Sequence, residues 1–141
     1  MSSVSALNMA AAVVLRDEDG RVLFVKENYG RGRWGLPGGV VEDGESPSGA
    51  AIREAAEEIC VTVELDHLIG LYHLRHEPGG SRFRHSGVRF IFAGRVVSGE
   101  PSLPDTGEIA EFAWFSPDEL PGRRMSLRSE IALPRACSVD S

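Results

Sequence analysis

The sequence feature that most constrains the fold is a glycine-dense stretch followed directly by the start of a helix. Residues 30–44 hold six of the chain's 16 glycines and include the step Leu36-Pro37-Gly38-Gly39. Because glycine reaches backbone angles that other residues disfavour, we expect a loop here. Ser46-Pro47 follows, which is typical of an N-cap with proline in the first helical turn. The sequence therefore predicts a helix from this point to about Ile59.

This predicted helix carries two contrasting sets of side chains. The apolar ones recur at helical spacing and are expected to pack on a sheet: Ile52, Ala55, Ala56 and Ile59. Glu54, Glu57 and Glu58 are expected to converge on the opposite face, where Arg53 offsets only part of their repulsion. Mg²⁺, which prefers carboxylate oxygens, would offset more. A plain solvated face is the alternative, since most charged helix faces are just that.

The rest of the chain predicts strands with short connections. Strands are expected at residues 9–15, 22–25, 61–75 (one or two strands), 88–97 and 111–115. The turn Asp17-Glu18-Asp19-Gly20 predicts a hairpin between the first two. Ser116-Pro117 is expected to cap a brief helix, and a weaker helix is expected over residues 124–133. This alternation predicts an α/β or α+β domain with a mixed sheet.

Composition narrows the class of protein. Without repeats or a linker, the 141 residues predict one domain over residues 9–134, with a disordered tail at 1–8 and a second tail at 135–141. No apolar run is long enough to cross a membrane. The net charge of −6 argues against stable binding to nucleic acid. Cys60 and Cys137 lack metal-ligand spacing, so reduced thiols and a cytoplasmic location are expected.

The stretch from Gly39 to Val61 resembles the Nudix box, G-x5-E-x7-R-E-U-x-E-E-x-G-U, in which U is aliphatic. Seven positions agree over these 23 residues: Gly39, Glu45, Arg53, Glu54, Glu57, Glu58 and Val61. Two positions depart. Ala55 stands where a larger aliphatic residue is usual, and Cys60 replaces a glycine. If position 60 must be left-handed, a residue other than glycine costs on the order of 1 kcal/mol there.

The resemblance covers roughly residues 9 to 120 and implies a fold and an activity. The implied fold is a Nudix-type α/β/α sandwich with a mixed β-sheet. The implied activity is Mg²⁺-dependent, or Mn²⁺-dependent, hydrolysis of the pyrophosphate bond in a nucleoside diphosphate linked to another moiety. In such chemistry metal ions clamp phosphate oxygens and activate the attacking water.

The resemblance also assigns roles to residues of this sequence. Glu57 and Glu58 would be metal ligands, and Glu54 would be either a further ligand or the base that orients the water. The backbone carbonyl of Gly39 would be another ligand. Arg53 would hold the glutamates by charge-assisted hydrogen bonds, and Glu45 would tie the loop to the helix.

Relatives often recruit one more glutamate from a loop outside the box. Glu108 is the better match for this further metal-binding and catalytic glutamate, and Glu111 is the second. The alternative for both residues is an ordinary loop charge, and for Glu108 the two interpretations have equal weight.

Substrate clues are weaker. Residues 73–89 form a basic island in an acidic protein, and Arg75, Arg84 and Arg89 are candidates for binding substrate phosphates. A solvated strand-loop-strand explains the island at least as well. Trp34, Phe83 and Phe90 are candidates for stacking on a base, although such aromatic residues more often lie in a core.

We therefore expect a pyrophosphohydrolase that acts on a small nucleotide-type substrate. A non-catalytic nucleotide-sensing module with the Nudix fold is the alternative, which intact glutamates argue against, and a protein-interaction domain is the third reading. A homodimer is compatible with the apolar strands. The identity of the substrate does not follow from the sequence.

Overall fold

The computed structural model describes residues 8–30, 32–74 and 87–119, and these residues form two sheets and one α-helix. The first sheet has the strand order β4-β1-β6-β5. Its strands are β1 (Asn8–Leu15), β4 (Gly38–Val40), β5 (Thr62–Leu74) and β6 (Gly87–Ser98). The second sheet has the order β3-β2-β7. Its strands are β2 (Val22–Glu27), β3 (Trp34–Gly35) and β7 (Ile109–Phe115).

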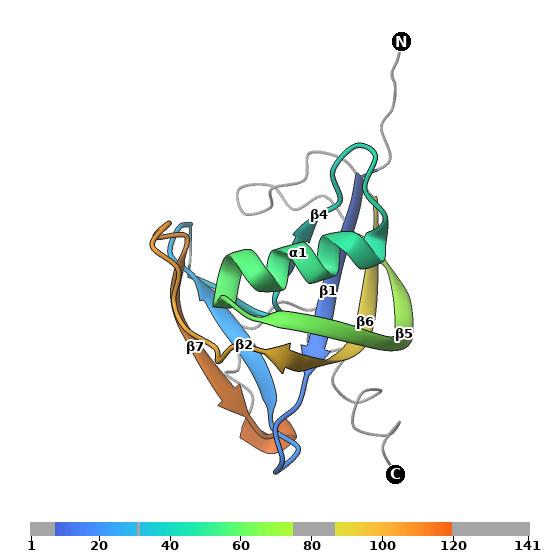
Figure 1. Ribbon diagram of the computed structural model, residues 1–141. Helices are drawn as coiled ribbons and strands as arrows, with labels where there is room; N and C mark the ends of the chain where they lie inside the picture. The colour runs from blue at the N-terminus through green and yellow to red at the C-terminus, as the bar shows by residue number, and fades with distance from the viewer. Residues whose placement is uncertain (1–7, 31, 75–86, 120–141) are drawn as a thin grey trace.

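The first sheet is mixed, as the sequence predicted. β1 runs parallel to β6 and antiparallel to β4, while β5 runs antiparallel to β6. Helix α1 (Pro47–Ile59) lies across this sheet, and a 3₁₀ turn, η1 (Pro117–Glu119), follows β7 (Figure 1). The α+β class is confirmed. The second predicted helix, at 124–133, lies outside the described residues, as do the two tails apart from Asn8.

The predicted hairpin between the first two strands is wrong beyond its turn. Asp17 closes the turn, because its carboxylate accepts from the backbone nitrogens of Asp19 and Arg21. Only one isolated bridge, Arg16 to Val22, then joins the strands among the described residues. Both edges of β1 are occupied by β4 and β6, and both edges of β2 by β3 and β7. No edge is left for a hairpin ladder, so the two strands enter different sheets.

The glycine-dense stretch contains two short strands that were predicted as loop. In β4, Gly38 and Gly39 pair with Ala12 and Ala11. A Cβ on Gly38 would lie 2.3 Å from the carbonyl oxygen of Ala11, so only glycine allows this approach. Gly38 therefore allows the backbone of β4 to pack closely on β1, a role that the prediction of a loop did not include.

The core lies between the two sheets and under α1. Phe24 is fully buried and meets the ring of Phe115 edge-on, and Trp34 meets Phe115 in the same way. Phe90 packs beside Ala50 and Ala51 of the helix. Trp34 and Phe90 thus belong to the core periphery, and Phe83 lies outside the described residues. Within the part of the chain that the structure describes, no helix is long and apolar enough to cross a membrane.

Candidate active site

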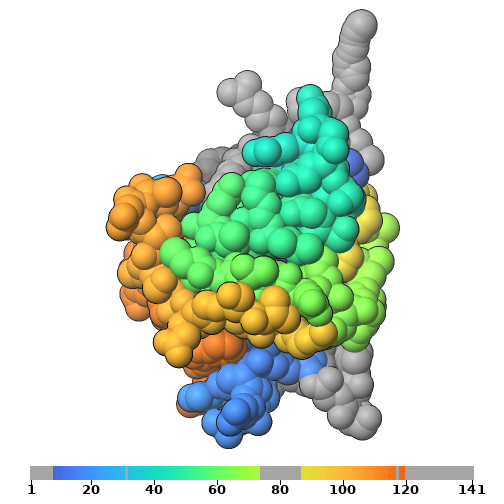
Figure 2. All heavy atoms as spheres, in the orientation of Figure 1, coloured from blue at the N-terminus to red at the C-terminus, as the bar shows by residue number. Residues whose placement is uncertain are grey.

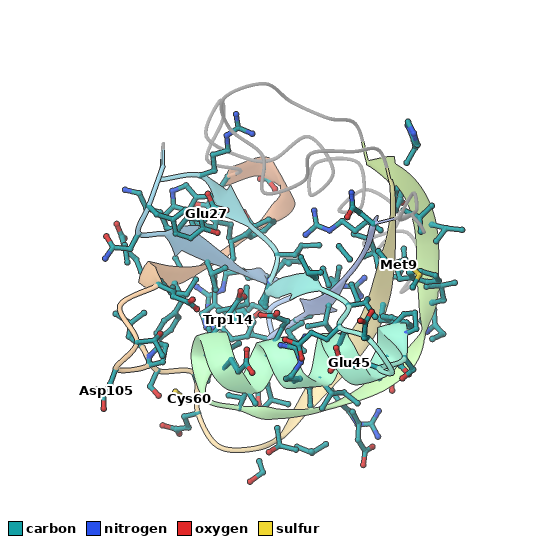
Figure 3. The ribbon with its side chains drawn as sticks, turned by 90° about the horizontal axis from the view of Figure 1, so that it is seen from above. Met9, Glu27, Glu45, Cys60, Asp105 and Trp114 are labelled. Carbon is teal, nitrogen blue, oxygen red and sulfur yellow. The ribbon has the colours of Figure 1, made fainter. Side chains whose placement is uncertain are left out.

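Helix α1 has the bounds that the sequence predicted. The Ser46 side chain accepts from the backbone nitrogen of Gly49 at 3.0 Å, and Pro47 opens the first turn. The helix ends at Ile59, after which Cys60 has φ 62° and ψ 34°, the left-handed conformation. Figure 3 shows Glu45 and Cys60 near opposite ends of the helix. A single element therefore fixes the spacing of the three glutamates.

The buried face of α1 differs from the predicted one. Ile52 and Ala56, which were expected in the apolar stripe, are exposed. The buried stripe instead consists of Ala50, Ala51, Glu54, Ala55, Glu58 and Ile59. The outer side of the helix lies open on the face seen in Figure 2. Only Glu57 stays on the solvent side, so the expectation that three carboxylates share one exposed face is wrong.

The buried face of α1 differs from the predicted one because the backbone of Gly38 and Gly39 packs against the helix. Glu58 is 7% exposed, and its Oε1 accepts from the backbone nitrogen of Gly38 at 3.1 Å. Glu54 is 9% exposed, and a Cβ on Gly39 would lie 2.4 Å from its Oε2. Apolar periodicity cannot predict this arrangement, because the room for two glutamates is made by glycines that are distant in sequence.

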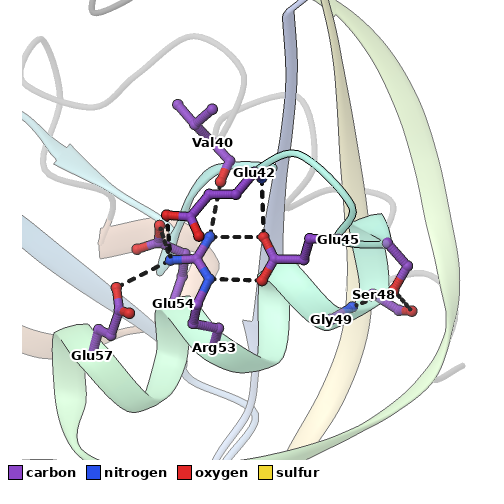
Figure 4. A network of polar contacts seen from close by, with 9 residues as sticks. Val40, Glu42, Glu45, Ser48, Gly49, Arg53, Glu54 and Glu57 are labelled. Atoms are coloured by element: carbon purple, nitrogen blue, oxygen red, sulfur yellow. Dashed lines mark hydrogen bonds and ion pairs between the residues drawn. The ribbon is translucent and has the colours of Figure 1, made fainter.

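Arg53 joins the glycine loop to the helix glutamates (Figure 4). Its Nε and Nη2 form a two-pronged contact with Glu45 at 2.7 and 3.0 Å. Its Nη2 also donates to the carbonyl of Val40 at 3.0 Å. Its Nη1 donates to Glu54 and Glu57, at 3.1 Å each. These are the contacts that the family resemblance implied for Arg53 and Glu45.

Electrostatics follow from this geometry. The hydrogen bonds from Arg53 and from the backbone of Glu42 hold the pKa of the Glu45 carboxyl below its usual value of 4.5. The same hydrogen bond to Glu45, with the charges of Glu54, Glu45 and Glu42, raises the pKa of Arg53 despite partial burial. Arg53 is therefore a permanent cation among several carboxylates.

Sequence reasoning did not single out Glu42 or Val40, which belong to the same network. The Glu42 Oε2 lies 3.8 Å from Arg53 Nη1, and its side chain is 68% exposed. Its backbone nitrogen donates to Glu45 Oε1 at 3.0 Å. Neither residue stands at a fixed position of the Nudix pattern, so motif spacing carries no signal for them.

Glu108 stands in the segment that leads into β7 and is exposed. Its backbone carbonyl accepts from Asn28 at 2.9 Å, which fixes the loop beside the end of β2. Glu111 lies within β7, 3.6 Å from Lys26. No interaction among the described residues links either carboxylate to the helix glutamates, so both roles stay predictions.

Of the three arginines predicted to bind substrate, only Arg89 lies in the described residues. It stands in β6, where its backbone pairs with Ala10 and Tyr72. Arg75 and Arg84 lie outside the described residues.

The donor set suits a hard divalent cation. Glu54, Glu57 and Glu58 offer only carboxylate oxygen, the donor that Mg²⁺ prefers, and two of them are buried. In the described residues no group of three acidic, histidine or cysteine side chains is already gathered for an ion. Glu54 Oε2 and Glu57 Oε1 accept from Arg53 Nη1, and Glu58 Oε1 accepts from the backbone nitrogen of Gly38, so each of these contacts uses one oxygen of its carboxylate.

A sequence model of the NUDIX domain matches residues 6–135, which is most of the chain. The chain therefore belongs to the NUDIX family.

Individual relatives agree with this assignment. The chain is 35% identical over 104 residues to the nucleoside triphosphate pyrophosphatase/Nudix hydrolase fusion protein of Bifidobacterium longum, covering 74% of this chain and 20% of that protein. It is 32% identical over 107 residues to the ADP-ribose pyrophosphatase of Methanocaldococcus jannaschii, covering 74% of this chain and 60% of that one. The chain thus spans less than two thirds of each of these two relatives.

The fold has solved counterparts. The NUDIX hydrolase from Nitrosomonas europaea superposes with a TM-score of 0.79 at 28% identity, covering 95% of this chain and 90% of that chain. This likeness confirms the fold class predicted from the sequence.

Proposed function

We propose that this protein is a Mg²⁺-dependent hydrolase that cleaves the pyrophosphate bond of a nucleoside diphosphate linked to another moiety. One observation carries the proposal: the carboxylates of Glu54 and Glu57 meet at Arg53 Nη1, and those of Glu54 and Glu58 lie against Gly39 and Gly38, so oxygen donors of the kind that Mg²⁺ prefers line one stretch of α1. Arg53 is shared among Glu45, Glu54 and Glu57, so a divalent cation would add to the neutralisation of these carboxylates. Mn²⁺ is the second metal that the family resemblance offers.

Each residue has a part in the proposed chemistry. Glu57, Glu58 and the carbonyl of Gly39 would hold the metal, which when bound neutralises phosphate charge and favours attack by water. Glu54 would be either a further ligand or the base that takes a proton from the attacking water. Arg53 would keep Glu54 and Glu57 oriented through its Nη1. Glu108 would add a carboxylate from the β7 side.

The names of relatives support the class of reaction and leave the substrate open. One relative is named as an ADP-ribose pyrophosphatase and another as a nucleoside triphosphate pyrophosphatase fused to a Nudix hydrolase. We propose a small nucleotide-type substrate whose phosphates are met by Arg75, Arg84 and Arg89. The acidic net charge of −6 argues against stable nucleic-acid binding.

The setting of the enzyme is part of the same proposal. We propose that residues 9–134 form a single domain, that it acts in the cytoplasm, and that a homodimer is its candidate assembly.

The test is a turnover assay on a panel of nucleoside di- and triphosphates, ADP-ribose, dinucleotides and nucleotide sugars. Phosphate and nucleoside monophosphate release is measured with Mg²⁺, and again after excess EDTA. We expect release from at least one nucleoside diphosphate derivative, abolished by EDTA and restored by added Mg²⁺. Binding without release across the panel would instead identify a nucleotide-sensing module. Neither binding nor release would point to an interaction domain.

A further inference from the structure

Asn28, the residue directly after β2, holds the segment that leads into β7 at two points. Its side-chain Nδ2 donates to the carbonyl of Gly107 at 2.9 Å, and its backbone nitrogen donates to the carbonyl of Glu108, also at 2.9 Å. Two successive carbonyls thus accept from one residue that is distant in sequence. The turn after β2 and the loop before β7 therefore meet, as Figure 1 shows.

The ladder of β2 and β7 is irregular just before Asn28. Its register shifts by one residue between Lys26 and Glu27, so β7 carries one residue that has no partner on β2. An irregularity of this kind interrupts the ladder and re-aims the side chains beside it. Glu108 lies beyond the shift, so the regular pairing of the strands does not fix its place. The two hydrogen bonds from Asn28 do so instead.

The side chain of Asn28 restrains a residue that is otherwise loosely held. Gly107 has φ +78°, and glycine exchanges this left-handed conformation readily for others. A Cβ on Gly107 would meet no atom within 4 Å, so no close packing surrounds this position. The nearby contact from the Glu108 nitrogen to the Thr106 hydroxyl is long, at 3.5 Å. The direction in which Glu108 leaves the backbone therefore depends on Asn28.

The start of β7 packs in the core beneath α1. Ile109, directly after Glu108, is 6% exposed and belongs to the same hydrophobic cluster as Ala55 and Ile59 of the helix. Those two helix residues each follow one of the α1 glutamates in sequence. The Glu108 side chain is exposed, and its carboxylate makes no hydrogen bond or ion pair among the described residues. The backbone before β7 is thus held close to α1, while the carboxylate that it carries stays available.

We propose that Asn28 is a positioning residue that directs the Glu108 carboxylate toward the divalent cation bound by the α1 glutamates. It acts through the carbonyls of Gly107 and Glu108 and is not itself a ligand. The inference rests on the proposed function, in which the α1 glutamates bind a metal and Glu108 adds a carboxylate. Loss of the Asn28 side chain should then weaken cation binding only while Glu108 keeps its charge.

A double-mutant cycle on Mn²⁺ binding separates this role from a structural one. The Kd of the full chain is measured from the electron paramagnetic resonance signal of free Mn²⁺. We expect Glu108→Gln to raise the Kd about tenfold, through loss of a charged ligand. Asn28→Ala should raise it about threefold, through loss of one hydrogen bond. The double variant should stay within about twofold of Glu108→Gln, because Asn28 then has no carboxylate to direct.

Ser116→Ala is the matched control. It removes an exposed side-chain hydrogen bond, to Glu119, at the other end of β7, and it should keep the Kd of the wild type. Asn28 is exposed, and its backbone hydrogen bond to Glu108 survives the substitution by alanine, so we expect that variant to fold.

The other outcomes decide against the inference in different ways. A Kd raised about thirtyfold in the double variant, the product of the two single effects, would show that Asn28 acts independently of Glu108 and would overturn the inference. An unchanged Kd in Asn28→Ala, or a rise in Ser116→Ala equal to that in Asn28→Ala, would also overturn it. An unchanged Kd in Glu108→Gln would overturn it while leaving the α1 glutamates as the metal site. Failure of the wild type to bind Mn²⁺ would instead overturn the proposed function, and the inference with it.

Discussion

At the scale of single residues, Cys60 stands where the Nudix pattern has glycine, and its backbone is strained as a result. It has φ 62° immediately after α1, and it is the only residue other than glycine with positive φ among the described residues. A Cβ is disfavoured in this conformation, whereas glycine adopts it freely. The sequence pattern could therefore locate the strained position, because a glycine is usual there.

Replacing this residue by glycine should stabilise the protein. We expect Cys60→Gly to raise the free energy of unfolding by about 1 kcal/mol, measured by urea denaturation. Cys60→Ala is the matched control, since it removes the thiol and keeps the Cβ, and it should gain nothing. A gain in the alanine variant equal to that in the glycine variant would show that the thiol, not the backbone, is the cause.

Other residues could not be assigned from the sequence. The motif predicts Glu54 and Glu58 as site residues, but it does not predict their burial. It depends on Gly38 and Gly39 approaching from β4, and side-chain periodicity within the helix holds no information on that contact. Glu42 was missed for the same reason, because its partner Arg53 lies on another element.

At the scale of elements, α1 was predictable because its signals are local. Ser46 and Pro47 mark its start in the sequence, and the helix ends at Ile59, which is the predicted bound. The predicted β1–β2 hairpin does not form beyond its turn. The sequence could not show this, since the pairing of strands depends on which strand edges are free in the sheet. β3 and β4 were missed because short strands rich in glycine have no strand propensity.

The contribution to stability of the contact between Glu45, in the loop before α1, and Arg53, in α1, should depend on pH. The pKa of Glu45 is lowered in the folded state, first by its hydrogen bond with Arg53, so its contribution to stability is present above about pH 4.5 and is lost as the pH falls through the lowered value. We expect Glu45→Gln to be less stable than the wild type at pH 7, with the gap narrowing steadily in acid. Urea denaturation at a series of pH values measures it. A gap that stays constant into acid would show that the charge of Glu45 does not matter.

At the scale of the whole molecule, composition and motif together predicted the class of fold and the family. The mixed sheet and the α+β class were confirmed, and the NUDIX model spans residues 6–135. The division into two sheets was not predicted, because it arises when β1 and β2 each acquire two partners of their own. The substrate could not be predicted either, since the residues of the motif do not describe what a substrate phosphate is attached to.

Metal-dependent hydrolysis by the α1 carboxylates can be tested by one comparison of variants. Mg²⁺-dependent kcat/KM is measured for Glu58→Gln beside the wild type, with Glu18→Gln, an exposed residue of the β1–β2 turn, as the control. Glutamine can still accept from Gly38, so the fold is kept while the charge is lost. We predict a loss of about 100-fold or more in Glu58→Gln and none in Glu18→Gln. Full turnover by a folded Glu58→Gln variant would contradict a role of the Glu58 carboxylate in metal-dependent hydrolysis.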